Sequence, residues 1–286
     1  MIRPGLPEVT AALPKTLHLP LVASQLLSLL QDPNSSIADV RRVLTHDPEL
    51  SKQVMALSRN NLVSQGKDVP DLNAAVSFLG FETLKSVILS LSILQSFPKT
   101  QGALHFNVQA FNNHSVAAAV VYRRLAREEG LHPDIGFLCG LLHDVGKILM
   151  NMACPREFEQ ALIMADRAQV YLHNVEGLVF ATNHAQVGAW LARSWSLPPD
   201  LVSFIETHHK PDPHKPSLIH AIAELADSLL IEKGLECPGS FGERVPPDSI
   251  WRVLRTPHTR IPGLLRDLDR DLKLATELFT TLEEGD

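Results

Sequence analysis

Apolar residues recur with helical spacing along nearly the whole of this 286-residue chain. In the segment 22–30, for example, they fall on one face of a helix that stops at Asp32-Pro33. No segment shows the period-two alternation of a half-buried strand, and the sequence contains no internal repeat. The pattern therefore predicts an all-α fold.

A run of turn-forming residues, Pro98 to Gly102, separates two sets of predicted helices. We therefore expect two packed helical lobes, an N-terminal lobe over residues 1–105 and a C-terminal lobe with a helical extension over residues 106–286. In the first lobe, Ser36 and Pro48 have the properties of helix starts, and Asp71 or Asn73 begins a further helix. The other predicted helices are 82–94, 111–129, 134–153, 155–168, 184–195, 198–209, 217–233, 248–254 and 263–282.

His143 and Asp144 are adjacent residues within the apolar predicted helix 134–153. Burying both side chains costs several kcal/mol unless a partner satisfies them. Neighbouring residues on a helix project about 100° apart, so both can reach one ion beside the helix. The alternative is a core polar pair that hydrogen-bonds to nearby backbone.

Further histidines and one more aspartate occur on other predicted helices, and histidine is the commonest metal ligand. These additional candidates are His114, His184, His208, His209 and Asp227. Such a set of imidazoles and two carboxylates suits one or two divalent transition metal ions, with iron, manganese and zinc as the candidates and an aspartate able to bridge.

The order His114, His143-Asp144, Asp227 resembles the HD superfamily of metal-dependent phosphohydrolases. With His184 and His208-His209 added, it is similar to the HD-GYP branch, which hydrolyses cyclic dinucleotides. Several other motifs resemble the HDOD domain of bacterial signalling proteins, over residues 12 to 230. They are Leu13-Pro14-Lys15, Leu19-Pro20, His46-Asp47-Pro48-Glu49-Leu50, Ser58-Arg59-Asn60, Ala75 to Gly80, His184 to Leu191 and Trp195 to Pro198.

The chain departs from the HD-GYP pattern in two places. The GYP signature expected after the paired histidines is replaced by Lys210 to Pro216, and Ala110 stands where some relatives carry a metal-binding Glu. Lys147 matches a basic residue near the phosphate in those relatives, although a surface lysine would give the same sequence pattern. In the dipeptide His46-Asp47, the aspartate precedes Pro48 and is expected to cap a helix.

Two functions follow from the resemblance. The first is a signal-transduction output or adaptor module, with a metal site, little or no hydrolase activity and a signalling protein as partner. The second is a metal-dependent phosphohydrolase that acts on a nucleotide or cyclic dinucleotide. In that enzyme Asp144 would bridge a first metal on His114, His143 and Asp227 to a second on His184, His208 and His209, while Lys147 would neutralise charge on the phosphate.

The charge and the cysteine content of the chain indicate which partners and which cellular compartment to expect. Lys plus Arg number 26 against 32 Asp plus Glu, a formal charge of −6, so we expect neither nucleic acid nor an anionic membrane as partner. The odd set of cysteines, Cys139, Cys154 and Cys237, argues against a disulfide framework. No stretch reaches about 18 uncharged apolar residues, so we expect a cytoplasmic protein.

Overall fold

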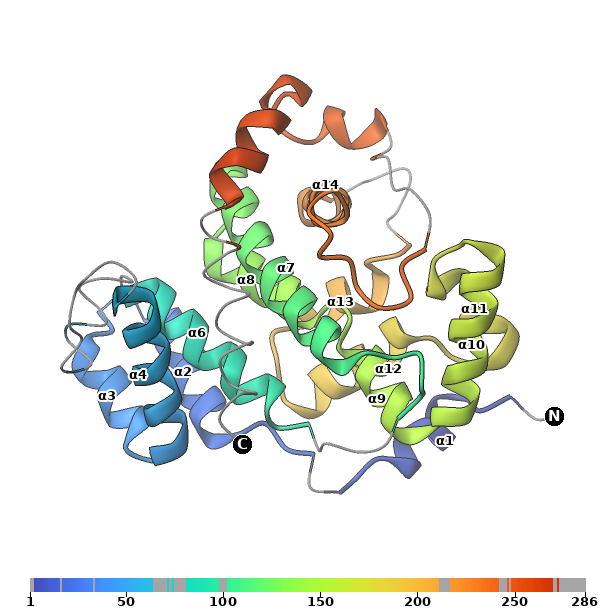
Figure 1. Ribbon diagram of the computed structural model, residues 1–286, viewed down its shortest axis with the longest axis horizontal. Coiled ribbons are helices and arrows are strands. Elements are labelled where there is room, and N and C mark those ends of the chain that lie inside the picture. Colours follow the sequence, from blue (N-terminus) through green and yellow to red (C-terminus); the bar gives the residue numbers. More distant parts are fainter. Residues whose placement is uncertain are drawn as a thin grey trace. The chain divides into compact units, whose positions relative to one another are not determined.

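The computed structural model describes residues 3–15, 17–32, 34–63, 71, 74, 81–97, 102–210, 217–241, 246, 248–269 and 272. Every regular element among these residues is helical (Figure 1), so the predicted all-α fold is confirmed. The chain divides into two compact units. The first unit comprises the described residues up to Lys15 and those from Gly102 to Leu272, and the second comprises those between Thr16 and Pro98.

The second unit contains α2 (Leu21–Gln31), α3 (Ile37–Leu44), α4 (Pro48–Val63) and α6 (Phe81–Leu94). Ser36 caps α3 through a reciprocal capping box with Asp39, as its position predicts. The carboxylate of Asp47 accepts a hydrogen bond from the Leu50 backbone N–H at 2.9 Å, so the capping role expected of this aspartate is confirmed. Of the helix predicted to start at Asp71 or Asn73, only Asp71 and Ala74 are described, and the carboxylate of Asp71 accepts a hydrogen bond from the Ala74 backbone N–H at 2.9 Å.

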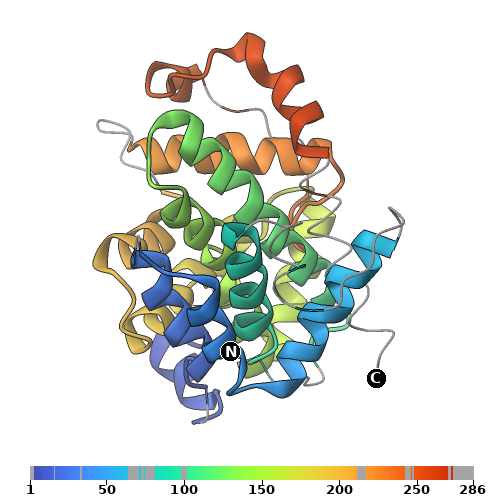
Figure 2. The same ribbon diagram turned by 90° about the vertical axis from the view of Figure 1, so that its left-hand side faces the viewer.

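The first unit is a helical assembly with α14 packed across α7 (Figures 1 and 2). Its helices are α1 (Leu6–Ala12), α7 (Val108–Glu129), α8 (Pro133–Leu142), α9 (Val145–Ala153), α10 (Pro155–Ala168), α11 (Leu172–Val179), α12 (His184–Ser194), α13 (Pro199–Thr207) and α14 (Leu218–Glu232). Two 3₁₀ segments follow, η1 (Asp248–Arg252) and η2 (His258–Arg260). The sequence pattern did not predict the short helices α1 and α11.

The predicted single helix 134–153 is wrong, because the structure breaks it into α8 and α9 at His143-Asp144. His143 keeps helical dihedrals, whereas Asp144 has φ −98° and ψ 5°. The residues on both sides of the break pack closely against the backbones of other helices. A Cβ on Gly140 would lie 2.5 Å from the carbonyl oxygen of Ala118 in α7, and one on Gly146 would lie 2.8 Å from the backbone nitrogen of Gly188 in α12. The apolar periodicity of the sequence does not depend on such crossings, so a prediction based on it continues the helix through the break.

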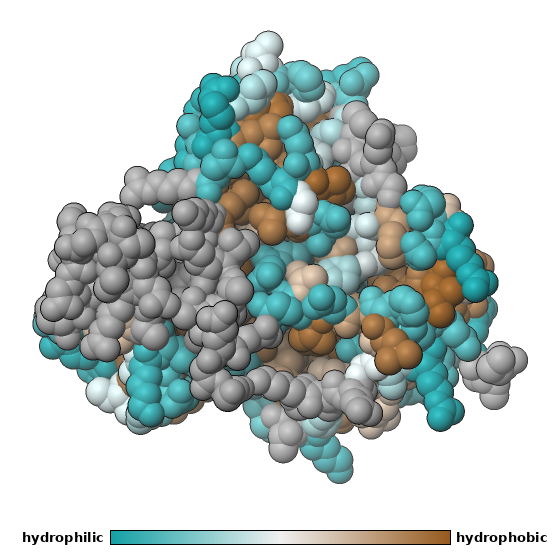
Figure 3. All heavy atoms as spheres, in the orientation of Figure 1, coloured by the Kyte–Doolittle hydropathy of each residue, from teal (hydrophilic) through white to brown (hydrophobic). Residues whose placement is uncertain are grey.

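The segment Pro133–Ala153 is long and apolar enough to cross a membrane by composition, with a mean hydropathy of 1.2. However, 89% of it is buried within the protein, and the break at His143-Asp144 interrupts it. It is the core of the first unit. Exposed apolar side chains such as Leu104, Ile135 and Leu178 lie in different parts of the chain, and hydrophilic residues lie between the apolar areas of the face seen in Figure 3.

Two further predictions fall partly outside the described residues. The proline-rich loop after the paired histidines is described only at Lys210, and residues 211–216 are not described. The last predicted helix, 263–282, is helical at the residues of it that are described, 263–269 and 272.

Candidate metal centre

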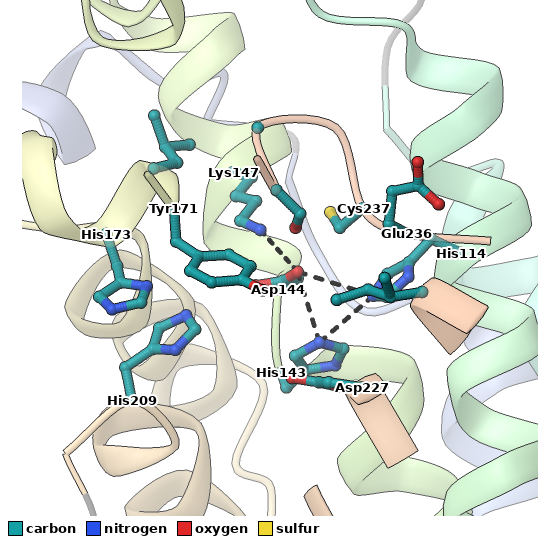
Figure 4. A pocket seen from close by; sticks show the side chains of 14 residues that line it. His114, His143, Asp144, Lys147, Tyr171, His173, His209, Asp227, Glu236 and Cys237 are labelled. Atoms are coloured by element: carbon teal, nitrogen blue, oxygen red, sulfur yellow. Dashed lines mark hydrogen bonds and ion pairs between the residues drawn. The ribbon is translucent and has the colours of Figure 1, made fainter. Parts of the chain in front are cut away.

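Side chains from several helices of the first unit converge on one buried site (Figure 4). They include every candidate ligand named from the sequence. These residues are His114 of α7, His143 and Asp144 between α8 and α9, Lys147 of α9, His184 of α12, His208 and His209 after α13, and Asp227 of α14.

Small residues bring α7 and α8 together. Cβ atoms on Gly136 and Gly140 would lie within 2.7 Å of α7 atoms, so only glycine allows the two backbones to pack this closely. This contact places the imidazole of His114 beside that of His143, with their Nε2 atoms 3.5 Å apart.

A second close crossing brings α9 to the start of α12. Gly146 lies against the backbone of His184, the first residue of α12. Asn183 fixes this helix start, because its side chain accepts a hydrogen bond from the backbone N–H of Gln186. As a result, His184 Nε2 lies 3.2 Å from Asp144 Oδ1.

The converging ligands form two groups that share Asp144, and within each group the ligand atoms lie within 4.8 Å of one another. The first group is His114, His143 and Asp144, and the second group is Asp144, His184, His208 and His209.

The two oxygens of Asp144 face different groups. Oδ2 lies 3.4 Å from His143 Nε2 and 3.8 Å from His114 Nε2. Oδ1 lies 3.2 Å from His184 Nε2 and 3.7 Å from His208 Nε2. This is the placement that a bridging carboxylate requires.

Hydrogen bonds on the outer side of each ring orient the histidines. The Nδ1 atoms of His114, His143 and His208 lie 2.7 to 2.9 Å from the backbone carbonyl oxygens of Leu235, Gly140 and Ile205. A carbonyl only accepts, so each Nδ1 must donate, and the lone pair of a neutral ring then lies on Nε2. The three lone pairs point into the site.

The spacing of these nitrogens fits a bound metal ion. His184 Nε2 lies 3.4 Å from His208 Nε2 and 3.0 Å from His209 Nε2. Neighbouring ligands about 2.1 Å from one ion are separated by about 3.0–3.4 Å, whether the arrangement is octahedral or tetrahedral. Asp144 Oδ1 is buried and makes no hydrogen bond with any described residue, so it is an acceptor left for a cation. The residues present therefore fit a divalent transition metal ion.

Burial sets the protonation of the ligands. It lowers the pKa of His114 to about 4, with help from the nearby His143, and lowers the pKa of His208 to about 4. Both rings are therefore neutral at pH 7, which is the form that binds metal. For His143 and His184, burial also acts downward, but nearby carboxylates outweigh it. Asp144 and Asp227 raise the pKa of His143, and Glu176 and Asp144 raise the pKa of His184.

Lys147 is buried, and its Nζ donates to Asp144 Oδ2 at 2.8 Å. The alternative of a surface lysine is therefore wrong. Burial opposes the charge on Lys147, but Asp144 more than compensates and raises the pKa of the ammonium group above its usual value.

Asp227 lines the same pocket, where the Tyr122 hydroxyl lies 3.3 Å from its carboxylate. It is not a member of either ligand group among the described residues, although its charge acts on both His114 and His143.

Glu176 is a site residue that the sequence analysis missed. It lies on α11 and is fully buried, and its carboxylate accepts from His184 Nδ1 at 2.7 and 2.9 Å. The backbone N–H of His184 also points to this carboxylate, at 3.3 Å and 3.4 Å. The available signal was a single acidic residue in the apolar stretch Val175 to Val179, eight positions before His184.

The segment that follows α14, Leu235 to Ser240, covers the site. Leu235 accepts from His114, Cys237 is buried in the pocket lining, and the Gly239 carbonyl accepts from the backbone N–H of Leu172 at 2.9 Å. The space left for the centre of a water molecule is about 20 Å³. This is room enough for an ion or a water molecule.

The first unit is helical, and the two histidine groups within it share the buried Asp144. Residues 17–211 match the HDOD domain, so this chain belongs to the HDOD family, as its motifs predicted.

Solved structures agree with this assignment. An HDOD domain protein of unknown function from Geobacter sulfurreducens is 26% identical, with a TM-score of 0.71 over 98% of this chain and 92% of that one. A proposed signal transduction protein from Marinobacter aquaeolei is 20% identical and shares the fold, with a TM-score of 0.78 over 98% of this chain and 62% of that one.

Curated relatives are longer than this chain. An uncharacterised protein of Treponema pallidum is 25% identical over 215 residues, which are 72% of this chain and 41% of the relative. Ribonuclease Y of Mycoplasma mycoides is 28% identical over 166 residues, 57% of this chain and 32% of that protein. The chain thus spans less than half the length of these relatives.

Proposed function

We propose that this chain is a cytoplasmic signal-transduction module that binds one or two divalent transition metal ions and hydrolyses phosphoesters little or not at all. The observation that carries the proposal is the closed site. All ligands of the first group are buried, and the segment Leu235 to Ser240 lies over them.

The closure acts against catalysis because a phosphoester must be held within about 3 to 3.5 Å of its nucleophile. When bound, a metal pair would supply Lewis acidity and an activated water. In this chain the space beside Asp144 is small, about 20 Å³ for the centre of a water molecule, and the thiol of Cys237 interacts with both Asp144 and Lys147. The residues that would contact a phosphate are therefore engaged with one another.

Output by contact with another protein fits such a module. The helical unit between Thr16 and Pro98 contributes none of the ligands in the two groups, which favours a different task for it. We propose a signalling protein as its partner. The formal charge of −6 supports a protein over nucleic acid or an anionic membrane.

A second candidate function is a metal-dependent phosphodiesterase. Two observations favour it: the buried Lys147 beside Asp144, which is suited to a phosphate, and the similarity to ribonuclease Y. This activity requires the segment Leu235 to Ser240 to move away from the site.

One experiment separates the two functions. Protein purified without added ions is assayed for bound metal by mass spectrometry, and then for turnover of a generic phosphodiester, cyclic dinucleotides and a short RNA. We expect bound metal and no turnover. Turnover that disappears in Asp144→Ala but persists in Glu129→Ala, which removes a buried carboxylate outside the pocket, would establish the phosphodiesterase instead.

A further inference from the structure

The two ligand groups meet different oxygens of Asp144, and these oxygens are not equivalent. Oδ2, on the side of the first group, already accepts from the Lys147 ammonium at 2.8 Å. Oδ1, on the side of the second group, is buried and makes no hydrogen bond with a described residue. A cation approaching the second group finds an available carboxylate oxygen, whereas one approaching the first group must displace or tolerate an ammonium group.

The outer sides of the two groups also differ. In the first group, the rings of His114 and His143 donate to neutral backbone carbonyls. In the second group, His184 donates to the carboxylate of the fully buried Glu176. A carboxylate behind a histidine ligand fixes the ring and makes its other nitrogen a stronger donor to metal.

Helix α11 supports the second group at two points. Glu176 holds His184, and the ring of His173, one turn earlier, stacks on His209 with centroids 4.0 Å apart and planes at 20°. Residues three apart lie on the same face of a helix, so this single face orients two ligands.

Other charged residues near the site do not cancel the difference between the two ligand groups. On the side of the first group, the charges of Asp227 and Lys147 act on His143 in opposite directions. Glu236 lines the pocket but is exposed, so water screens its charge. Glu176 is a buried negative charge that holds a ligand of the second group directly.

We infer that the site is unequal by construction: the second group binds one divalent metal ion tightly with Glu176 as its positioning residue, and Lys147 weakens binding at the first group. The inference rests on the proposed metal-binding function and specifies its stoichiometry. It also gives a physical reason for weak hydrolysis, since two-metal chemistry requires both ions.

Calorimetric titration of chelator-treated full-length protein with Zn²⁺, and separately with Mn²⁺, tests the inference. We expect one tight equivalent and a second that is at least 100-fold weaker. Glu176→Gln should weaken the tight equivalent by about 10–100-fold. Glu176→Asp, which keeps the charge, should recover part of that loss. Lys147→Met should tighten the second equivalent at least tenfold.

Glu129→Gln is the matched control. Glu129 is equally buried, and its carboxylate accepts from the backbone N–H groups of Arg255 and Thr256 at 2.7 and 2.9 Å, outside the pocket. We expect this variant to be less stable but to bind metal as the parent does. Thermal melts of each variant without metal separate lost stability from lost affinity.

Two results would overturn the inference. One is a pair of equivalents of equal affinity in the parent protein. The other is an unchanged tight equivalent in Glu176→Gln, while this variant melts as Glu129→Gln does. Either result leaves the proposed module intact, because that proposal fails only if metal is absent or phosphoesters are turned over.

Discussion

The close approach of α9 to α12 is the contact on which the metal centre most depends, and Gly146→Ala tests it. A Cβ at this position would overlap the carbonyl oxygen of His184, and would lie 2.7 Å from its carbonyl carbon and 2.8 Å from the backbone nitrogen of Gly188. Non-bonded heavy atoms prefer separations of about 3.5–4.0 Å. The two backbones must therefore move apart by more than about 1 Å.

This displacement has two consequences. Overpacking of a core costs about 1–3 kcal/mol, and more where backbone must move, against a gain of about 0.5–1 kcal/mol from replacing glycine in a helix. We expect the free energy of unfolding to fall by about 2 kcal/mol or more. The separation of His184 Nε2 from Asp144 Oδ1, now 3.2 Å, should also increase, so that metal affinity falls at least tenfold.

Alanine substitutions at two other glycines provide a comparison for the stability change of Gly146→Ala. Gly177 lies in α11 with nothing within 4 Å of an added Cβ, so Gly177→Ala should stabilise the protein by about 0.5–1 kcal/mol. For Gly188→Ala, the nearest atoms lie 3.1–3.2 Å away, so its cost should be intermediate. Guanidinium unfolding in chelator gives the stabilities, and metal titration gives the affinities. If Gly146→Ala is as stable as Gly177→Ala, the close crossing does not hold the site together.

Three further outcomes are expected. Asp144→Ala should remove bound metal and with it the rise in melting temperature that metal gives, since a ligand of the native state stabilises it by mass action; retained metal would contradict the bridging role. For metal-free protein, the free energy of unfolding should fall as the pH drops from 6.5 to about 4, because His114 and His208 stay neutral in the folded state down to a pKa of about 4 but take up protons on unfolding. The raised pKa values of His143 and His184 add stability that is fully present in this range and is lost only at higher pH, so melts at pH 6.5 and 5 that coincide would refute the argument. Ser36→Ala should cost about 1 kcal/mol through the cap of α3 and leave metal content unchanged; loss of metal in this variant would link the two units.

The sequence alone predicted the features that local chemistry encodes. Helices such as α6, α10 and α14 follow from apolar periodicity, and the cap at Ser36 follows from residue type and position. The ligands of both groups were also predicted, because histidine and aspartate in apolar helices need a partner and the HDOD resemblance supplies their order. These features depend on the type of each residue and on its near neighbours in the sequence, so they can be predicted without the tertiary structure.

Only the tertiary structure decided how these residues work together. The break at His143-Asp144 depends on backbone crossings at Gly140 and Gly146, whose partners lie far away in the sequence. Lys147 has the sequence pattern of a surface lysine until folding buries it against Asp144. Glu176 and the segment Leu235 to Ser240 reach the site only through long-range packing. Periodicity records which face of a helix is buried, but not which charge it meets there, and that pairing determines whether the site binds metal, excludes substrate or does both.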